Sequence, residues 1–390
     1  MRQGPVRVVA AGKAAMGMAD AVTAVLGEHG VTGALVTAAI DPRAVRRPWQ
    51  AFEAGHPKPT DGSERAGRAA LALADATSRD GGVLLVLLSG GASAMLAVPA
   101  DGLSLGDKAA ATDVMLRAGL DIGEMNLVRR HLSGIKGGRL AARAGRSITL
   151  AISDVCTPVE DDPRVIGSGP TVRDDSSPAE AMAVLQRHAL VERVPAAVVR
   201  VLEAAAARDA AGPPLDARRP QAAYWVIASR QDAMRGAAET ARRLGYHTTV
   251  HAAPVTGAAR TAARPLLDEI AHLERPACLI ASGETIVHVR GAGRGGRNQE
   301  LAVGAWGDLP SLAPAALIAI GTDGRDGPTD AAGAYVDETS WTELGPGASA
   351  RCAAALEDND VYPLLDRAGA LLRTGPTGTN VGDLCVIVTR

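Results

Sequence analysis

Residues 6–27, with the sequence VRVVAAGKAAMGMADAVTAVLG, decide the fold class. The run Val6–Ala11 is short and almost wholly apolar, as expected of a strand buried in a parallel sheet. Residues 14–26 then place apolar side chains at helical spacing, and Gly27 can end that helix. Because a strand followed at once by a helix is the repeating unit of α/β proteins, the stretch predicts a parallel sheet with helices on both faces.

The same alternation continues along the chain and divides it into two domains. Further strands are expected at residues 34–39, 83–88 and 148–152, and helices at 63–77, 105–118, 179–188 and 196–208. Pro213, Pro214 and Pro220 then interrupt regular structure, so we place a domain boundary at residues 212–220. In the second domain, a helix is expected at 232–243, with Ser229 as its N-cap. The strands expected in this domain are 224–228, 247–251, 277–281, 286–289, 316–320 and 384–388. The prediction is a two-domain α/β protein with domains 1–212 and 220–390.

Charge and composition exclude several functional classes. The 390 residues carry 41 basic and 43 acidic side chains, a net charge of -2, so no bulk positive field is present to gather nucleic acid. Aromatic residues make up 2% of the chain, which leaves few platforms for base stacking. No apolar run approaches the roughly 20 residues needed to cross a bilayer. We therefore expect neither a nucleic acid nor a membrane as partner.

The chain start and the cysteines indicate a cytoplasmic protein. Met1 to Pro5 run directly into the first strand, which leaves no room for a signal peptide. The four cysteines, Cys156, Cys278, Cys352 and Cys385, lie far apart without a CxxC pair, so we interpret them as ordinary thiols. The cytoplasm is the expected location.

Three loops in the first half combine glycines with groups that bind anions. Lys13 follows the first strand at a helix start, a position that favours binding of an anion. The alternative is that Lys13 is a solvent-exposed loop lysine without a ligand. Two glycine-containing runs are candidate binding loops for a phosphate or carboxylate: Ser89–Ser93 (SGGAS) and Ser133–Gly138 (SGIKGG), which contains Lys136. The alternative for both is a plain turn without a ligand. Asp154, at a strand end, can be a base, a metal ligand or a helix cap. GxxxxGK[ST] is absent, since Ala14 follows Lys13, and this excludes a P-loop enzyme.

The second half contains a denser polar run, Gly291–Glu300 (GAGRGGRNQE), which opens a helix. It formally satisfies GxGxxG, with Asp323 as the acid expected in a dinucleotide site, so that interpretation stays open. The spacing from Gly296 to Asp323 is longer than the roughly 20 residues typical of that motif, and arginines flank the third glycine. Such a charged loop favours a polyphosphate or carboxylate ligand.

Two further loops carry carboxylates and hydroxyls. Residues 321–330 (GTDGRDGPTD) place three aspartates just after a buried strand, where a cation, a polyol or a set of Asx turns would explain them. Residues 374–380 (TGPTGTN) precede the last strand and suit either turns or ligand contacts. From all these loops, we assign to substrate or nucleotide binding Ser89, Gly90, Gly91, Ser93, Lys136, Gly137, Asn298, Glu300, Asp323, Asp326, Asp330, Thr377 and Asn380.

The ordered series of these motifs resembles the glycerate 2-kinase family, whose C-terminal part is the MOFRL domain. The series runs from Gly12-Lys13-Ala14-Ala15 through Gly55-His56-Pro57, the Ser89 loop, residues 126–138, 152–155 and 167–171 to the three C-terminal loops. The resemblance implies a Rossmann-like N-terminal domain, a smaller α/β C-terminal domain with its MOFRL-like part at about 276–388, and a cleft between them where ATP phosphorylates D-glycerate. It also implies catalytic roles for Lys13, Asp154 and Arg297.

The mechanism implied by this resemblance is phosphoryl transfer by positioning and charge neutralisation. Lys13 and Arg297 would neutralise the phosphoryl group and the glycerate carboxylate, and Asp154 would orient the acceptor hydroxyl. The expected cofactors are ATP and Mg²⁺, with Asp323 as a metal ligand; homo-oligomerisation is left open. Two other functions are retained: a nicotinamide-dependent hydroxypyruvate reductase, supported by GxGxxG alone, and a non-catalytic sensor of a small acid.

Overall fold

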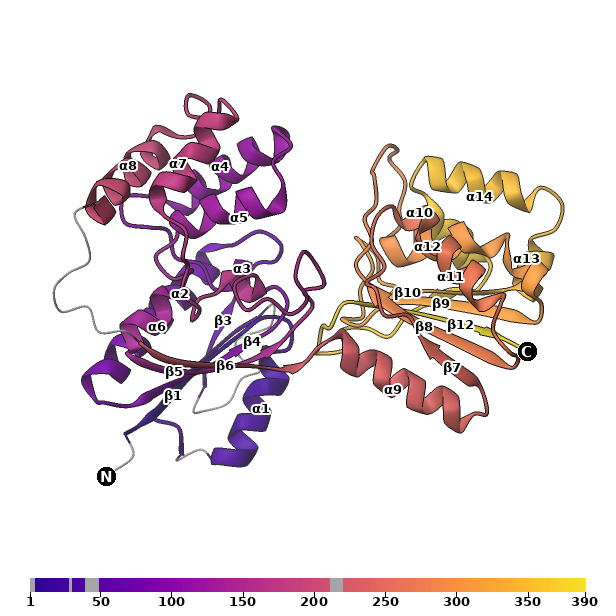
Figure 1. Cartoon of the computed structure of the whole chain (residues 1–390), viewed down its shortest axis with the longest axis horizontal. Helices are drawn as coiled ribbons and strands as arrows, with labels where there is room; N and C mark the ends of the chain where they lie inside the picture. The colour runs from indigo at the N-terminus through magenta and orange to yellow at the C-terminus, as the bar shows by residue number, and fades with distance from the viewer. Residues whose placement is uncertain (1–3, 28–29, 39–48, 211–219) are drawn as a thin grey trace. The chain divides into compact units, whose positions relative to one another are not determined.

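The computed structural model describes residues 4–27, 30–38, 49–210 and 220–390, so most of the domain boundary expected at 212–220 lies outside the described residues. The chain divides into two compact units (Figure 1). The first unit holds Met1–Ala151 and Asp162–Ile227, and the second holds Ile152–Asp161 and Ala228–Arg390. A short segment from the middle of the sequence, which includes Asp154, therefore belongs to the second unit.

A six-stranded sheet forms the centre of the first unit, in the order β3-β2-β1-β4-β5-β6. From β3 to β5, all neighbouring strands pair in parallel, which confirms the predicted parallel sheet. The strands are β1 (Val6–Ala11), β2 (Gly33–Ala38), β3 (Trp49–Glu53), β4 (Val83–Leu88), β5 (Arg146–Ile152) and β6 (Gln221–Ala228). The central strands β1 and β4 are the most apolar because helices cover both of their faces.

Two strands of this sheet differ from the sequence prediction. β3 was not predicted, because it is a half-exposed strand at the sheet edge and has no continuous apolar run. β6 was expected to open the second domain, but it completes the opposite edge of the first sheet. The local sequence pattern of β6 predicts a strand but does not determine which sheet the strand joins. Pairing with residues far away in the sequence determines the sheet.

Helices of two kinds surround the first sheet. One set packs on the sheet: α1 (Ala15–Leu26), α2 (Asp61–Arg79) and α6 (Arg139–Ala144), with the short α3 (Ala92–Met95) packed against α2. A second set packs mainly on itself: α4 (Leu105–Arg117), α5 (Ile122–His131), α7 (Pro178–Arg187) and α8 (Ala196–Ala210), with its own apolar core (Figure 1). Ser104 and Ser177 start α4 and α7 through capping boxes, which satisfy backbone N–H groups at the helix starts. The short helix η3 (Ile166–Ser168) precedes α7.

The second unit contains a mixed sheet in the order β11-β10-β9-β12-β8-β7. Its strands are β7 (His247–Val250), β8 (Ala277–Gly283), β9 (Ala315–Gly321), β10 (Gly333–Asp337), β11 (Leu371–Leu372) and β12 (Asp383–Thr389). β12 lies antiparallel between β8 and β9, with Asp383 opposite both Gly283 and Gly321. Its start therefore meets the ends of β8 and β9, and residues after those strands converge at one edge of the sheet.

Helices also cover this second sheet. They are α9 (Arg230–Arg243), α10 (Ala259–Ala262), α11 (Arg264–Ile270), α12 (Arg297–Trp306), α13 (Glu338–Leu344), α14 (Ala348–Glu357) and α15 (Val361–Arg367), with η4 (Leu309–Leu312). Ser229 caps α9 as predicted. The predicted strand 286–289 is wrong: only Ile286 forms an isolated bridge, and Val289 is 78% exposed.

In the described part of the chain, no helix has the length and apolarity that a membrane crossing requires. All four cysteines are buried free thiols.

Candidate active site

In the first unit, the loop after β1, which holds Gly12 and Lys13, is hydrogen-bonded to the SGGAS loop after β4. The Lys13 amide donates to the Gly90 carbonyl at 2.9 Å, and the Ala14 amide donates to Ser89 Oγ at 2.9 Å. Gly12 has φ +118°, and a Cβ there would lie 2.4 Å from Ser89 Oγ, so only glycine fits this crossing. These bonds fix the backbone position of Lys13 beside the SGGAS loop.

A buried lysine joins the SGGAS loop to a third loop. The Lys136 side chain is 3% exposed, and its Nζ donates to the Ser93 carbonyl at 2.8 Å, to Ser93 Oγ and to Ser168 Oγ at 3.4 Å. The two serine hydroxyls lie 2.8 Å apart. Burial, together with the charges of Lys108 and Arg129, lowers the pKa of Lys136 well below its usual value. The sequence-predicted residues Ser93, Lys136 and, next in the chain, Gly137 thus share one polar region.

In the second unit, the segment Asn380–Asp383 holds two of the three residues to which the resemblance gives catalytic roles. Asn380 Nδ2 donates to Asp154 Oδ2 at 2.5 Å. Arg297 donates to Asp383 twice, from Nε to Oδ2 at 2.5 Å and from Nη2 to Oδ1 at 2.9 Å. Arg297 also pairs with Glu284, which follows β8. An acid and an arginine are therefore fixed by residues three positions apart at one end of β12.

The loop after β9 is hydrogen-bonded to the segment Asn380–Asp383. Thr322 Oγ1 donates to the Gly382 carbonyl at 2.6 Å and accepts from the Val381 amide at 2.9 Å. Thr377 Oγ1 donates to the Thr322 carbonyl at 2.5 Å, and its amide donates to the Asp323 carbonyl at 3.3 Å. The structure thereby brings the predicted residues Asp323, Thr377 and Asn380 to one sheet edge.

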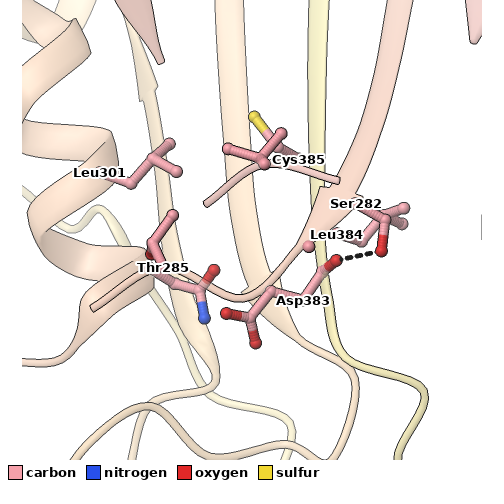
Figure 2. A pocket seen from close by; sticks show the side chains of 9 residues that line it. Ser282, Thr285, Leu301, Asp383, Leu384 and Cys385 are labelled. Atoms are coloured by element: carbon pink, nitrogen blue, oxygen red, sulfur yellow. Dashed lines mark hydrogen bonds between the residues drawn. The ribbon is translucent and has the colours of Figure 1, made fainter. Parts of the chain in front are cut away.

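A small pocket lies beside this pairing, and Figure 2 shows the Ser282 hydroxyl donating to the Asp383 carbonyl at its wall. The pocket is lined by Val255, Ser282, Gly283, Thr285, Asn298, Leu301, Asp383, Leu384 and Cys385. Asp383, the first residue of β12, is a buried carboxylate with 8% exposure. Asp383 is not among the residues predicted from the sequence, although a carboxylate directly before the apolar run LCVIVT is a signal for it.

Three predicted residues lie in hydrogen-bond networks of the second unit. Asp326 Oδ1 and Oδ2 accept from the amides of Asn298 and Gln299 at 3.0 and 2.8 Å, so Asp326 caps α12. Glu300 is 2% exposed and accepts from Asn359 Nδ2 at 2.7 Å. Asp330 accepts from Tyr362 at 2.6 Å and from Arg373 at 3.1 Å. In the described structure, each of these carboxylates is occupied by protein donors.

The glycine-rich loop before α12 is occupied in the same way. Asn359 Oδ1 accepts from the amides of Arg290 and Gly291, and Asp360 Oδ1 accepts from the amide of Arg294. At Gly293, a Cβ would lie 2.3 Å from the Asp360 side chain, so the glycine allows this close packing. In addition, β12 separates β8 from β9, whereas a dinucleotide fold places these two strands side by side. The formal GxGxxG match therefore lacks the structural context of a dinucleotide site.

The burial of Asp326 predicts a pH-dependent contribution to stability. Burial raises its pKa to about 6, against the amides of Asn298 and Gln299, which lower it. Because the folded-state pKa is the higher one, its favourable contribution is fully present below about pH 4 and is lost as pH rises through about 6. The free energy of unfolding of wild type, relative to Asp326→Asn, should fall by about 2–3 kcal/mol between pH 4 and 7. Urea unfolding at several pH values measures this difference; a constant difference would contradict the assignment.

Family models match both halves of the chain. The model described as a domain of unknown function, DUF4147, matches residues 1–203, and the model of the MOFRL family matches residues 277–383. The fold and the motif loops define a class of two-unit α/β proteins. Within this class, the chain belongs to the glycerate 2-kinase family, with a MOFRL C-terminal part.

Three similar proteins extend over nearly the whole chain. "Glycerate 2-kinase" of Pyrococcus horikoshii is 36% identical over 99% of this chain and 88% of that protein. A "Putative hydroxypyruvate reductase" of Agrobacterium vitis is 36% identical over 98% of both chains. The crystal structure of glycerate kinase from Thermotoga maritima is 34% identical and superposes with a TM-score of 0.84, covering 100% of this chain and 92% of that one. The match confirms the predicted two-part α/β fold.

Proposed function

We propose that this chain is a glycerate 2-kinase, which transfers the terminal phosphoryl group of ATP to the 2-hydroxyl of D-glycerate. The observation that carries the proposal is that Asn380 holds Asp154 and that Asp383, three positions further on, holds Arg297. One short segment of the chain thus binds both an acid and an arginine. The full-length similarity to a glycerate 2-kinase and to the solved glycerate kinase supports the same reaction.

In the proposed reaction, Asp154 orients the acceptor hydroxyl and takes its proton as the oxygen attacks the γ-phosphorus. Asn380 holds the Asp154 carboxylate at 2.5 Å, which limits its rotation. Arg297 and Lys13 neutralise negative charge on the phosphoryl group and on the glycerate carboxylate. ADP leaves with the electrons of the broken phosphorus–oxygen bond. Positioning and charge supply the catalysis, since this transition state requires little covalent chemistry.

Magnesium is proposed together with ATP. Among residues 4–27, 30–38, 49–210 and 220–390, no group of three or more His, Cys, Asp or Glu side chains is placed to hold a metal. Mg²⁺ in kinases needs only one or two carboxylates in addition to phosphate oxygens. Asp323 adjoins the 374–382 segment and fits that smaller requirement. The ion would neutralise phosphate charge there.

The Agrobacterium vitis relative is named as a putative hydroxypyruvate reductase, which is the alternative function. It needs a dinucleotide site, but the amides of the glycine loop and of the first turn of α12 are bonded to Asn359, Asp360 and Asp326. The two activities are distinguished by one assay. ATP with Mg²⁺ and a panel of small hydroxy acids should yield ADP, most efficiently with D-glycerate. NADH consumption with hydroxypyruvate, without ADP formation, would contradict the proposal.

A further inference from the structure

A lysine and two serine hydroxyls of the first unit form a hydrogen-bonded group that the proposed phosphoryl transfer does not use. Lys136 Nζ lies 2.8 Å from the Ser93 carbonyl oxygen and 3.4 Å from Ser168 Oγ, and it also contacts Ser93 Oγ. The two hydroxyl oxygens are 2.8 Å apart. Lys136 and Ser168 are buried, whereas Ser93 is only partly buried. Within this serine–lysine group, Ser93 is therefore the residue that a small molecule can reach.

The three oxygen neighbours of Lys136 satisfy a neutral amine as well as an ammonium group. The Ser93 carbonyl can only accept, so it takes one N–H in either state. Each hydroxyl carries a proton as well as lone pairs, so Ser93 Oγ can accept from an ammonium group or donate to the lone pair of a neutral amine. The contacts thus allow a proton to pass between Ser93 Oγ and Nζ without breaking the group.

The surroundings of Lys136 favour the neutral amine. Its neighbours in the group are a carbonyl and two hydroxyls, and in the part of the chain that the structure describes no carboxylate pairs with it. A buried ammonium group without a carboxylate is costly. Burial is the main cause that lowers the pKa of Lys136 well below its usual value. A neutral lysine in hydrogen-bond contact with a hydroxyl is a base.

The backbone around Ser168 is strained in a way that fixes its hydroxyl in this group. Ser168 has φ +63°, a left-handed conformation that serine rarely adopts, and the glycines on either side are also left-handed. The Gly137 amide donates to the Ser168 carbonyl at 3.3 Å, and the Gly138 amide donates to the Gly169 carbonyl at 2.8 Å. These bonds tie the strained turn to the residues that follow Lys136. Strained backbone held by such contacts is typical of functional sites.

We propose that Ser93 is a nucleophile, with Lys136 as its general base and Ser168 as a positioning residue, and that it takes the acyl group of a small carboxylic ester. A hydroxyl, a base within hydrogen-bond distance and a third group that orients them are the elements of nucleophilic catalysis. An ester suits this group better than a phosphate, because phosphoryl transfer needs cations and a neutral amine supplies none. The inference is independent of the proposed kinase activity.

The proposed reaction is an ester hydrolysis in two steps. Ser93 Oγ forms a bond to the carbonyl carbon, and its proton moves to Lys136 Nζ. The ester C–O bond breaks with its electron pair on the alcohol oxygen, which takes the proton from Nζ. Water then attacks the acyl-serine through the same base, and Ser93 regains its proton as the acid leaves. One ester and one water give one acid and one alcohol, with no change of oxidation state.

Labelling of the full chain with an alkyl fluorophosphonate tests whether Ser93 is activated. This probe forms a covalent bond to nucleophilic serines with loss of fluoride, and peptide mass spectrometry locates the adduct. We expect one adduct, on Ser93, and none in Ser93→Ala. Ser311→Ala is the matched control, because it removes an exposed serine that has no lysine in hydrogen-bond contact, and it should be labelled like wild type. Absence of an adduct on Ser93 in wild type would overturn the inference.

Two variants test the roles of the buried residues. Lys136→Arg keeps a cation that cannot accept a proton, so labelling should slow at least a hundredfold in protein whose melting shows that it is folded. Ser168→Gly removes the hydroxyl and relieves the left-handed strain, so labelling should slow about tenfold while the melting temperature stays near that of wild type. Labelling of either variant at the wild-type rate would contradict the role given to that residue.

Hydrolysis of p-nitrophenyl acetate tests the acyl chemistry itself. Wild type should release a burst of about one p-nitrophenol per chain as Ser93 is acetylated, and Ser93→Ala should show no burst. Equal release by the two proteins would overturn the ester assignment. Failure of wild type to form ADP from ATP and D-glycerate would contradict the proposed function and would leave the labelling and burst results standing.

Discussion

Lys13→Met should lower kcat by about two to three orders of magnitude while the protein stays folded. A positioned charge near the transferring phosphoryl group contributes roughly 3–4 kcal/mol to the transition state. The backbone of Lys13 is fixed by its bond to the Gly90 carbonyl and by Gly12, which no larger residue can replace at φ +118°. The loop therefore holds its place when the side chain changes, and the loss reports on the ammonium group.

Arg65→Met serves as the control for this substitution, because it removes an exposed cation from α2 in the same unit. Steady-state kinetics with D-glycerate and ATP, with circular dichroism to verify folding, make the comparison. A folded Lys13→Met protein that keeps more than about a third of wild-type kcat would show that Lys13 has no part in the chemistry.

Arg297→Lys should lower kcat/KM by about a hundredfold or more, although the positive charge is kept. Arg297 grips Asp383 with two hydrogen bonds and contacts Glu284 with a third nitrogen, and a lysine cannot reproduce this planar geometry. Loss of the second bond frees the cation to move away from the position that the proposed chemistry requires. A misplacement of about 1 Å is enough for an effect of this size.

Arg294→Lys is the matched control, since Arg294 lies in the loop just before α12 and stacks over the Tyr362 ring at 4.0 Å instead of joining Asp383. Asp383→Asn supplies a second readout. If Asp383 acts by orienting Arg297, the double variant should be little worse than Arg297→Lys alone. Activity within twofold of wild type in Arg297→Lys would show that only charge, or nothing at this residue, contributes.

The parts of the fold that could be predicted from sequence are those determined locally. β1 and β4 are recognisable because central parallel strands are apolar on both faces, and the Ser229 cap because its partner lies within a few residues. The sheet to which β6 belongs, and the assignment of residues 152–161 to the second unit, depend on pairings far apart in sequence. No local pattern encodes them.

The candidate site divides in the same way. The motifs locate Asp154 and Arg297, but the residues that hold them, Asn380 and Asp383, lie 226 and 86 positions away in the chain. Asp326 and Glu300 have the residue types of ligands, yet their carboxylates accept hydrogen bonds from α12 and from Asn359. A loop carboxylate and a helix cap look alike until the donors around them are placed.

The most direct test of the proposed glycerate 2-kinase activity is the identity of the phosphorylated product. A cationic clamp that holds the glycerate carboxylate near the phosphoryl group brings the adjacent 2-hydroxyl within the roughly 3–3.5 Å near-attack distance, whereas the terminal hydroxyl needs another pose. The reaction product is passed to enolase without phosphoglycerate mutase, and phosphoenolpyruvate is measured. We predict that phosphoenolpyruvate forms at once, because only 2-phosphoglycerate is a substrate of enolase. Phosphoenolpyruvate that appears only after mutase is added would identify 3-phosphoglycerate as the product and contradict the account.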